Sequence, residues 1–224
     1  MFQVKICGIR TQAELQAIVD AGADAVGLNF YPASKRYVTP ATASQLVAWL
    51  QQTVPTDRRP AVVGLFVNAS AAEIADIARQ VPLDYIQLHG DEPPEMLNQL
   101  PPLPIVKAFR CQGGDVGPVR TYVATCQRLG ARLAGVILDS AVGGAWGGTG
   151  QAADWSALSE SLAEPLGIPV ILAGGLNPQN VESAVGQVRP EGVDTASGVE
   201  GPDGLKDGRQ VEEFVRNAWR SLRG

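Results

Sequence analysis

Cysteine and histidine are both scarce in this chain. Its 224 residues include three cysteines and a single histidine. Three widely spaced cysteines do not suit a disulfide-stapled scaffold, and they fit a reducing compartment. With one histidine and neither a CxxC nor an HExxH pattern, the sequence argues against a transition-metal centre, so we expect no bound metal.

Long apolar runs and an excess of positive charge are also missing. No apolar stretch approaches the roughly 18 residues that cross a bilayer, and no signal-peptide pattern precedes the first strand-like run. Eighteen basic against 23 acidic side chains give a net charge of -5, which argues against a broad nucleic-acid surface. We therefore expect a cytoplasmic protein that binds neither membranes nor nucleic acids.

The composition is that of a globular protein. Hydrophobic residues make up 45% of the chain and charged residues 18%, which is far from the composition of disordered chains. A chain of this length buries about 70% of the surface that its unfolded form exposes. No linker or low-complexity tract divides it, so we expect one domain over residues 1–224.

Eight short apolar runs recur along the chain, and a helix-like stretch follows each of them. The runs are apolar on both faces, as buried parallel strands are. They are Val4–Ile6, Ala25–Leu28, Val62–Phe66, Tyr85–Leu88, Ile105–Ala108, Gly135–Leu138, Val170–Ala173 and Gly192–Asp194. Eight even strand–helix units predict a closed (β/α)₈ TIM barrel, with an open doubly wound sheet as the competing α/β arrangement.

Capping patterns mark where several helices begin. Thr11 and Ser70 each stand three residues before a glutamate, which predicts two capping boxes. The pairs Thr39-Pro40 and Asn177-Pro178 place a capping residue before a proline at the first helical position.

Polar residues and glycines lie at the carboxyl ends of the predicted strands, where the active sites of such barrels lie. Those singled out are Cys7, Asn29, Lys35, Arg36, His89, Arg110, Asp139, Ser140, Gly174, Gly175, Asn177, Asp194, Thr195, Ser197 and Gly198. The two glycine-containing loops after the last two strands predict a phosphate site, because glycine lets backbone N–H groups approach a ligand closely. Tight turns without a ligand are the other interpretation.

Cys7 and Asp139 are candidates for reactive side chains. A lone cysteine is more often a small buried hydrophobic residue, but a strand end at the barrel mouth also suits a thiolate that acts as a base or a nucleophile. Lys5 points to the same side of its strand as Cys7, one layer deeper. Asp139 ends an apolar run, where it could be a helix cap or, with a raised pKa, a general acid.

The sequence motifs taken together resemble the phosphoribosylanthranilate isomerase family of tryptophan biosynthesis. They are VKICGIR, ASKRYV, GLFVN, QLHGDE, LDS, GGTG, LAGGLNPQNV and DTASGVE, in the family's order from residue 4 to residue 200. The family is a (β/α)₈ barrel that performs an Amadori rearrangement on a phosphosugar without cofactor or metal. The chain departs from the usual pattern at Ala196, where a serine is common, and at Ala153, where a phenylalanine is common.

The resemblance implies a role for individual residues. Cys7 matches the general base, Asp139 the general acid and Arg36 the arginine that holds the anthranilate carboxylate. Gly174, Gly175, Asn177, Ser197 and Gly198 fall in the phosphate loops, and His89 and Asp194 match recurrent substrate-site positions without a defined role. The sequence leaves open whether the chain is a monomer or a homodimer.

Three other functions are weighed against this one. A related isomerase of an aminoimidazole carboxamide ribotide uses two aspartates at strand ends, and the cysteine here disfavours it. A Schiff-base aldolase would need a lysine at the mouth, and Lys107 lies two residues short of the expected loop. A non-catalytic phosphosugar-binding barrel would have no need of both Cys7 and Asp139.

Overall fold

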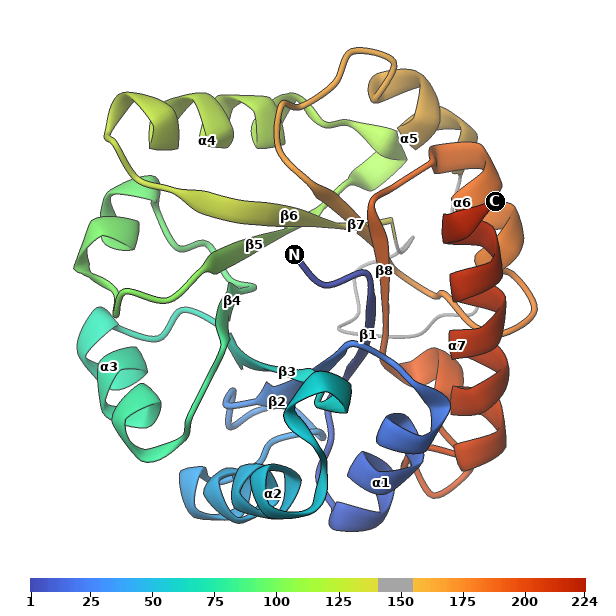
Figure 1. Ribbon diagram of the computed structural model, residues 1–224. Coiled ribbons are helices and arrows are strands. Elements are labelled where there is room, and N and C mark those ends of the chain that lie inside the picture. The colour runs from blue at the N-terminus through green and yellow to red at the C-terminus, as the bar shows by residue number, and fades with distance from the viewer. Residues whose placement is uncertain (141–154) are drawn as a thin grey trace.

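Eight parallel strands form a closed barrel at the centre of the computed structural model, which describes residues 1–140 and 155–224 (Figure 1). The strands are β1 (Val4–Cys7), β2 (Ala25–Asn29), β3 (Ala61–Phe66), β4 (Tyr85–Leu88), β5 (Ile105–Arg110), β6 (Leu133–Asp139), β7 (Val170–Ala173) and β8 (Gly192–Thr195). Each strand pairs with the next, and β8 closes the ring by pairing with β1, where Lys5 lies opposite Asp194. The predicted (β/α)₈ barrel is confirmed, and the open sheet is wrong.

Helices surround the barrel on its outside, as Figure 1 shows. They are α1 (Gln12–Ala21), α2 (Pro40–Thr53), α3 (Ala71–Gln80), α4 (Gly117–Arg128), α5 (Trp155–Ser161), α6 (Val181–Val188) and α7 (Gly208–Arg223). Between β4 and β5 the chain forms a 3₁₀ helix at Pro94–Gln99 in place of the expected α-helix. Among the described residues, no helix is both long and apolar enough to cross a membrane.

Three of the four predicted helix starts are confirmed. Thr11 and Ser70 form complete capping boxes, and Thr39 caps α2 with Pro40 in its first turn. The prediction at Asn177 is wrong, because α6 begins at Val181. The Asn177 side chain instead accepts hydrogen bonds from the backbone N–H groups of the next turn, an arrangement that competes with helix formation.

The apolar residues form an inner and an outer core. The inner core fills the barrel with Phe2, Ala25, Val63, Val106, Ala108, Ile137, Ile171 and Ala173. Phe2 packs edge-on against Tyr85 at a ring distance of 5.3 Å, inside the ring of strands where Figure 1 marks the N-terminus. The larger outer core lies between strands and helices. The inner core fills the barrel below the carboxyl ends of the strands, so the space for a ligand lies at those ends.

Several strands run further than their apolar residues do. The last strand residues include Cys7, Asn29, Arg110, Asp139 and Thr195, each one or two positions beyond the predicted end. The backbone hydrogen bonds between strands form whatever the polarity of the side chains. The apolar runs used to predict the strands, in contrast, end at the last apolar residue. These side chains are therefore fixed by strand backbone and not carried on loops.

Candidate active site

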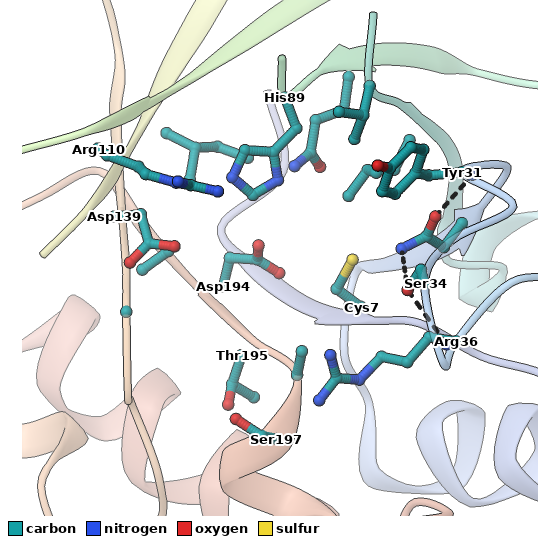
Figure 2. Close-up of a pocket in the computed structure, with 18 of the residues that line it drawn as sticks. Cys7, Tyr31, Ser34, Arg36, His89, Arg110, Asp139, Asp194, Thr195 and Ser197 are labelled. Atoms are coloured by element: carbon teal, nitrogen blue, oxygen red, sulfur yellow. Dashed lines mark hydrogen bonds between the residues drawn. The ribbon is translucent and has the colours of Figure 1, made fainter. Parts of the chain in front are cut away.

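A cavity of about 470 Å³ opens at the carboxyl ends of the strands. Of the ten residues that the family resemblance assigns to the site, nine line the cavity: Cys7, Arg36, His89, Asp139, Gly174, Gly175, Asp194, Ser197 and Gly198. Figure 2 shows Cys7 and Asp139 on opposite sides of this space, with Asp194 between them. Asn177 is absent from the lining, because its side chain is used in the turn before α6. The GGTG motif lies outside the described residues.

Cys7 is held tightly at the end of β1. Its exposed fraction is 6%. Gly8, which follows it, has φ +85°, and its N–H donates to the Gly27 carbonyl at 2.9 Å. A β-carbon on Gly27 would lie 2.7 Å from Cys7 Sγ, so the glycine of the neighbouring strand leaves the space that the sulfur occupies. Burial raises the pKa of the Cys7 thiol, against the opposing charge of Lys5.

A buried ion pair lies beneath the thiol. Lys5 Nζ donates to Asp194 Oδ1 at 2.8 Å, and the exposed fraction of the Lys5 side chain is 0%. Burial alone would lower the pKa of Lys5. The negative charges of Asp194 and the Cys7 thiolate act in the other direction and raise this pKa above its ordinary value. Asp194 thus lines the cavity while its carboxylate is committed to a lysine on the adjacent strand.

Arg36 is held from below by a second buried group. Its Nε donates to Glu200 Oε1 at 2.5 Å and its Nη2 to Glu200 Oε2 at 3.0 Å. Lys206 Nζ lies 2.9 Å from Glu200 Oε1 and is itself buried. Burial would raise the pKa of Glu200, but Arg36 and Lys206 lower it to about 2. The guanidinium is therefore fixed at the cavity wall (Figure 2).

The loops after β7 and β8 are tied to each other. Gly174 and Gly175 have φ of 94° and 69°, a backbone region that favours glycine. Thr195 Oγ1 donates to the Leu176 carbonyl at 2.6 Å, and a β-carbon on Gly198 would lie 1.8 Å from that same oxygen. The close approach of two glycine-containing backbones creates a concave wall that suits an anion.

His89 is a neutral imidazole at the end of β4. Burial lowers its pKa to about 4, and the charges of two buried lysines and Arg110 act in the same direction. At neutral pH it can donate one hydrogen bond and accept another, without adding charge to the cavity.

The lowered pKa of His89 predicts a loss of stability in acid. The unfolded chain binds this proton near pH 6.5, whereas the folded chain resists it until about pH 4. The free energy of unfolding should therefore fall between pH 6.5 and 4 by up to about 3 kcal/mol more in the wild type than in His89→Asn. Urea unfolding at both pH values measures this, and equal losses in the two proteins would contradict it.

Lys107 does not reach the cavity, so it is not the lysine that the aldolase alternative requires. It points outward from β5, where Nζ donates to the Gly90 carbonyl at 2.7 Å and lies 3.3 Å from Glu92 Oε2. In the described part of the chain, no group of three or more histidine, cysteine, aspartate or glutamate side chains could hold a metal ion.

Three site residues were missed at the sequence level. Gln87 lines the cavity, and its buried Oε1 has no hydrogen-bond partner among the described residues. The sequence could have indicated Gln87, because it lies two residues before His89 and side chains two apart on a strand point to the same face. Glu200 and Lys206 act through Arg36, and no spacing rule connects them because Glu200 is 164 residues away from it in sequence.

Comparison with known proteins agrees with this geometry. A profile of the family described as N-(5'phosphoribosyl)anthranilate (PRA) isomerase matches residues 4–217. The chain belongs to this family. An N-(5'-phosphoribosyl)anthranilate isomerase of Stutzerimonas stutzeri is 45% identical over 212 residues, covering 95% of this chain and 94% of the relative.

Solved structures of the phosphoribosylanthranilate isomerase family have the same architecture. The enzyme from Thermotoga maritima superposes with a TM-score of 0.83 at 35% identity, covering 98% of this chain and 100% of the other. A second structure, solved in complex with reduced 1-(o-carboxyphenylamino)-1-deoxyribulose 5-phosphate, gives 0.80 at 34% identity with the same coverage. That ligand is a phosphosugar carrying an aromatic carboxylate.

Proposed function

We propose that the chain isomerises N-(5-phosphoribosyl)anthranilate to 1-(2-carboxyphenylamino)-1-deoxyribulose 5-phosphate, an Amadori rearrangement in tryptophan biosynthesis. The observation that carries this proposal is the placement of Cys7 and Asp139 on opposite sides of one cavity, in a barrel of this family (Figure 2). The reaction needs one acid and one base on the two sides of a sugar, and no redox change in the protein.

Asp139 is the general acid of the proposed mechanism. It ends β6, and the backbone N–H of Cys111 donates to its carbonyl at 2.9 Å, so the residue is fixed at the cavity edge. A protonated carboxyl there gives its proton to the ribose ring oxygen. The C1–O bond then breaks, and the anthranilate nitrogen supplies the electrons that form a Schiff base.

Cys7 is the general base. Ring opening makes the C2 hydrogen acidic, because the adjacent protonated imine accepts the electrons of the C–H bond. A thiolate at Cys7 removes this proton and gives an enolamine, which gains a proton at C1 and loses the proton of its C2 hydroxyl to become the ketone product. Burial raises the pKa of the thiol and so works against formation of the thiolate, whereas the charge of Lys5 favours it.

The remaining cavity residues bind the two ends of the substrate. Glu200 uses the Nε–Nη2 edge of Arg36, so the other edge of the guanidinium is directed to the anthranilate carboxylate. The glycine-containing walls at Gly174-Gly175 and Ser197-Gly198 hold the phosphate. With both ends fixed, the sugar lies between Asp139 and Cys7.

Substitution of Gly27 by alanine should displace the base. The new β-carbon would lie 2.7 Å from Cys7 Sγ and 3.1 Å from Cys7 Cα, so the end of β1 must shift. A misplacement on the order of 1 Å lowers turnover about 100-fold. Steady-state kinetics of Gly27→Ala should show this loss mainly in kcat. Gly186→Ala, whose β-carbon meets nothing within 4 Å, is the matched control and should keep wild-type kcat; a similar kcat for both variants would contradict the prediction.

The competing function is a phosphosugar-binding barrel without catalysis. Anthranilate is fluorescent, and its signal in freshly prepared phosphoribosylanthranilate falls when the ketose forms. An isomerase lowers the signal faster than the protein-free solution does, and mass spectrometry finds a product of unchanged mass. Binding of the substrate by folded protein without any faster loss would favour the binding barrel.

The proposal includes a cytoplasmic location and a small-molecule substrate as the partner. Three unpaired cysteines in the described structure are compatible with a reducing compartment.

A further inference from the structure

Lys5 is a charged side chain at the centre of a barrel interior that is otherwise rich in apolar residues. Its exposed fraction is 0%. Interiors of such barrels are normally filled by branched apolar side chains, and a buried ion pair is usually no more stabilising than an apolar pair of the same volume. The Lys5–Asp194 pair therefore calls for a reason other than stability.

The neighbours of Lys5 suggest that reason. Its ammonium donates to Asp194 Oδ1 at 2.8 Å, and its positive charge lowers the pKa of the Cys7 thiol against the effect of burial. Lys5 and Cys7 are two residues apart on β1, so both side chains point into the barrel, with Lys5 beneath the sulfur. A fixed positive charge thus lies under the atom that must become negative.

The other elements around Cys7 contribute one anion and one cation that act on the thiol. Asp194 on β8 opposes formation of the thiolate, and Lys206, after β8, favours it. Arg36 approaches Gly8 closely, with its Cδ 2.3 Å from where a β-carbon of that glycine would be. On β2 the facing residue is Gly27, which carries no charge.

We propose that Lys5, held in place by Asp194, is a positioning residue that stabilises the thiolate of Cys7 and so sets how much of the protein carries an active base. The proposal rests on the proposed function, in which Cys7 is the base. Asp194 has two opposed effects: it keeps Lys5 charged and oriented, and its own charge limits how far the thiol is activated.

A second buried lysine provides the comparison within the same barrel. Lys107 pairs with Glu92 on the outer side of β5 and donates to the backbone carbonyls of Gly90 and Ala108. These contacts are those of a structural lysine. Lys5 differs because its hydrogen bond goes to Asp194, which lines the cavity, and because its side chain lies on the same face of β1 as Cys7.

The test titrates the thiol directly, without substrate. A thiolate absorbs near 240 nm, so the difference in absorbance between each protein and the same protein carrying Cys7→Ser follows Cys7 alone as the pH rises. In Lys5→Met the midpoint should rise by at least about one pH unit, because an opposite charge has been removed from beside the thiolate. In the double variant Lys5→Met/Asp194→Asn the midpoint should rise by less than in Lys5→Met, because the anion that opposes the thiolate is removed as well. Lys107→Met, the matched control, should keep the wild-type midpoint.

A raised midpoint in Lys5→Met supports the proposal, and an unchanged midpoint in this folded variant overturns it. If Lys5→Met does not fold, the charge-balanced double variant Lys5→Met/Asp194→Asn is compared with Asp194→Asn, which keeps the lysine. The midpoint should be higher in the double variant, because only Asp194→Asn retains an ammonium beneath the thiolate; equal midpoints would overturn the role of Lys5.

The pH dependence of kcat distinguishes a lysine that stabilises the thiolate from one that only stabilises the fold. In Lys5→Met, kcat at pH 7 should fall at least about tenfold, with recovery as the pH rises, because the thiol still ionises at a higher pH. KM should change little, since Lys5 lies beneath Cys7 and out of reach of the substrate. A shift in the thiol midpoint without any turnover by the wild type would refute the isomerase function and leave the charge relation intact.

Discussion

Replacing Cys7 with alanine is expected to lower kcat for phosphoribosylanthranilate by roughly 100- to 10,000-fold, the usual contribution of a general base. KM should remain close to that of the wild type, because Arg36 and the glycine-containing loops still bind the two ends of the substrate. Steady-state measurement of fluorescence loss gives both constants. The variant should fold normally, since the change removes one sulfur atom from a site at the cavity wall.

Cys111→Ala is the control for the loss of a buried thiol. Cys111 has an exposed fraction of 3% and belongs to the outer core. Its replacement should lower stability and leave kcat unchanged. If Cys7→Ala and Cys111→Ala retained similar turnover, Cys7 would be no more than a packing residue.

Replacing Asp139 with asparagine is expected to reduce kcat by a similar factor, roughly 100- to 10,000-fold. The amide has nearly the same shape, but it has no carboxyl proton to give to the ribose ring oxygen, so the ring opens only at the rate that water supports. Binding should be weakened far less than catalysis. Rapid-mixing kinetics with excess enzyme separates the two effects.

Asp84→Asn serves as the matched control for Asp139→Asn. Asp84 lies just before β4, at the opposite end of the barrel, where Oδ2 accepts the backbone N–H of Val62 at 2.7 Å. Its replacement should cost stability and leave kcat unchanged. Loss of kcat in both variants to the same extent would show that the effect of Asp139 is structural.

The barrel could be predicted because its strands carry a local signal. Parallel strands buried on both faces are continuous apolar runs, and all eight were found within one or two residues. The start of α6 was missed because Asn177 has two ways to satisfy nearby backbone N–H groups. In the structure it does so in a turn, three residues before Asn180, which directly precedes the helix. Residue type alone does not distinguish a turn from a cap.

The cavity could be predicted through the same signal, since strand ends converge at one rim whatever the side chains are. The ion pairs beneath it could not. Lys5 pairs with Asp194 across 189 positions of sequence, and Arg36 pairs with Glu200 across 164. Such pairings depend on barrel closure and on register, which brings Lys5 of β1 opposite Asp194 of β8. Sequence reasoning placed Lys5 beneath Cys7 but had no means of finding its partner.

The division of labour between Asp139 and Cys7 is the central claim, and one trapping experiment tests it most directly. The acid opens the ring before the base acts, so Cys7→Ala should accumulate the open-chain Schiff base, whereas Asp139→Asn should not form it. Sodium cyanoborodeuteride reduces an imine and marks C1 with deuterium, which mass spectrometry detects. The account predicts labelled adduct from Cys7→Ala well above the protein-free level and none above it from Asp139→Asn. The reverse pattern would contradict the assignment of acid and base.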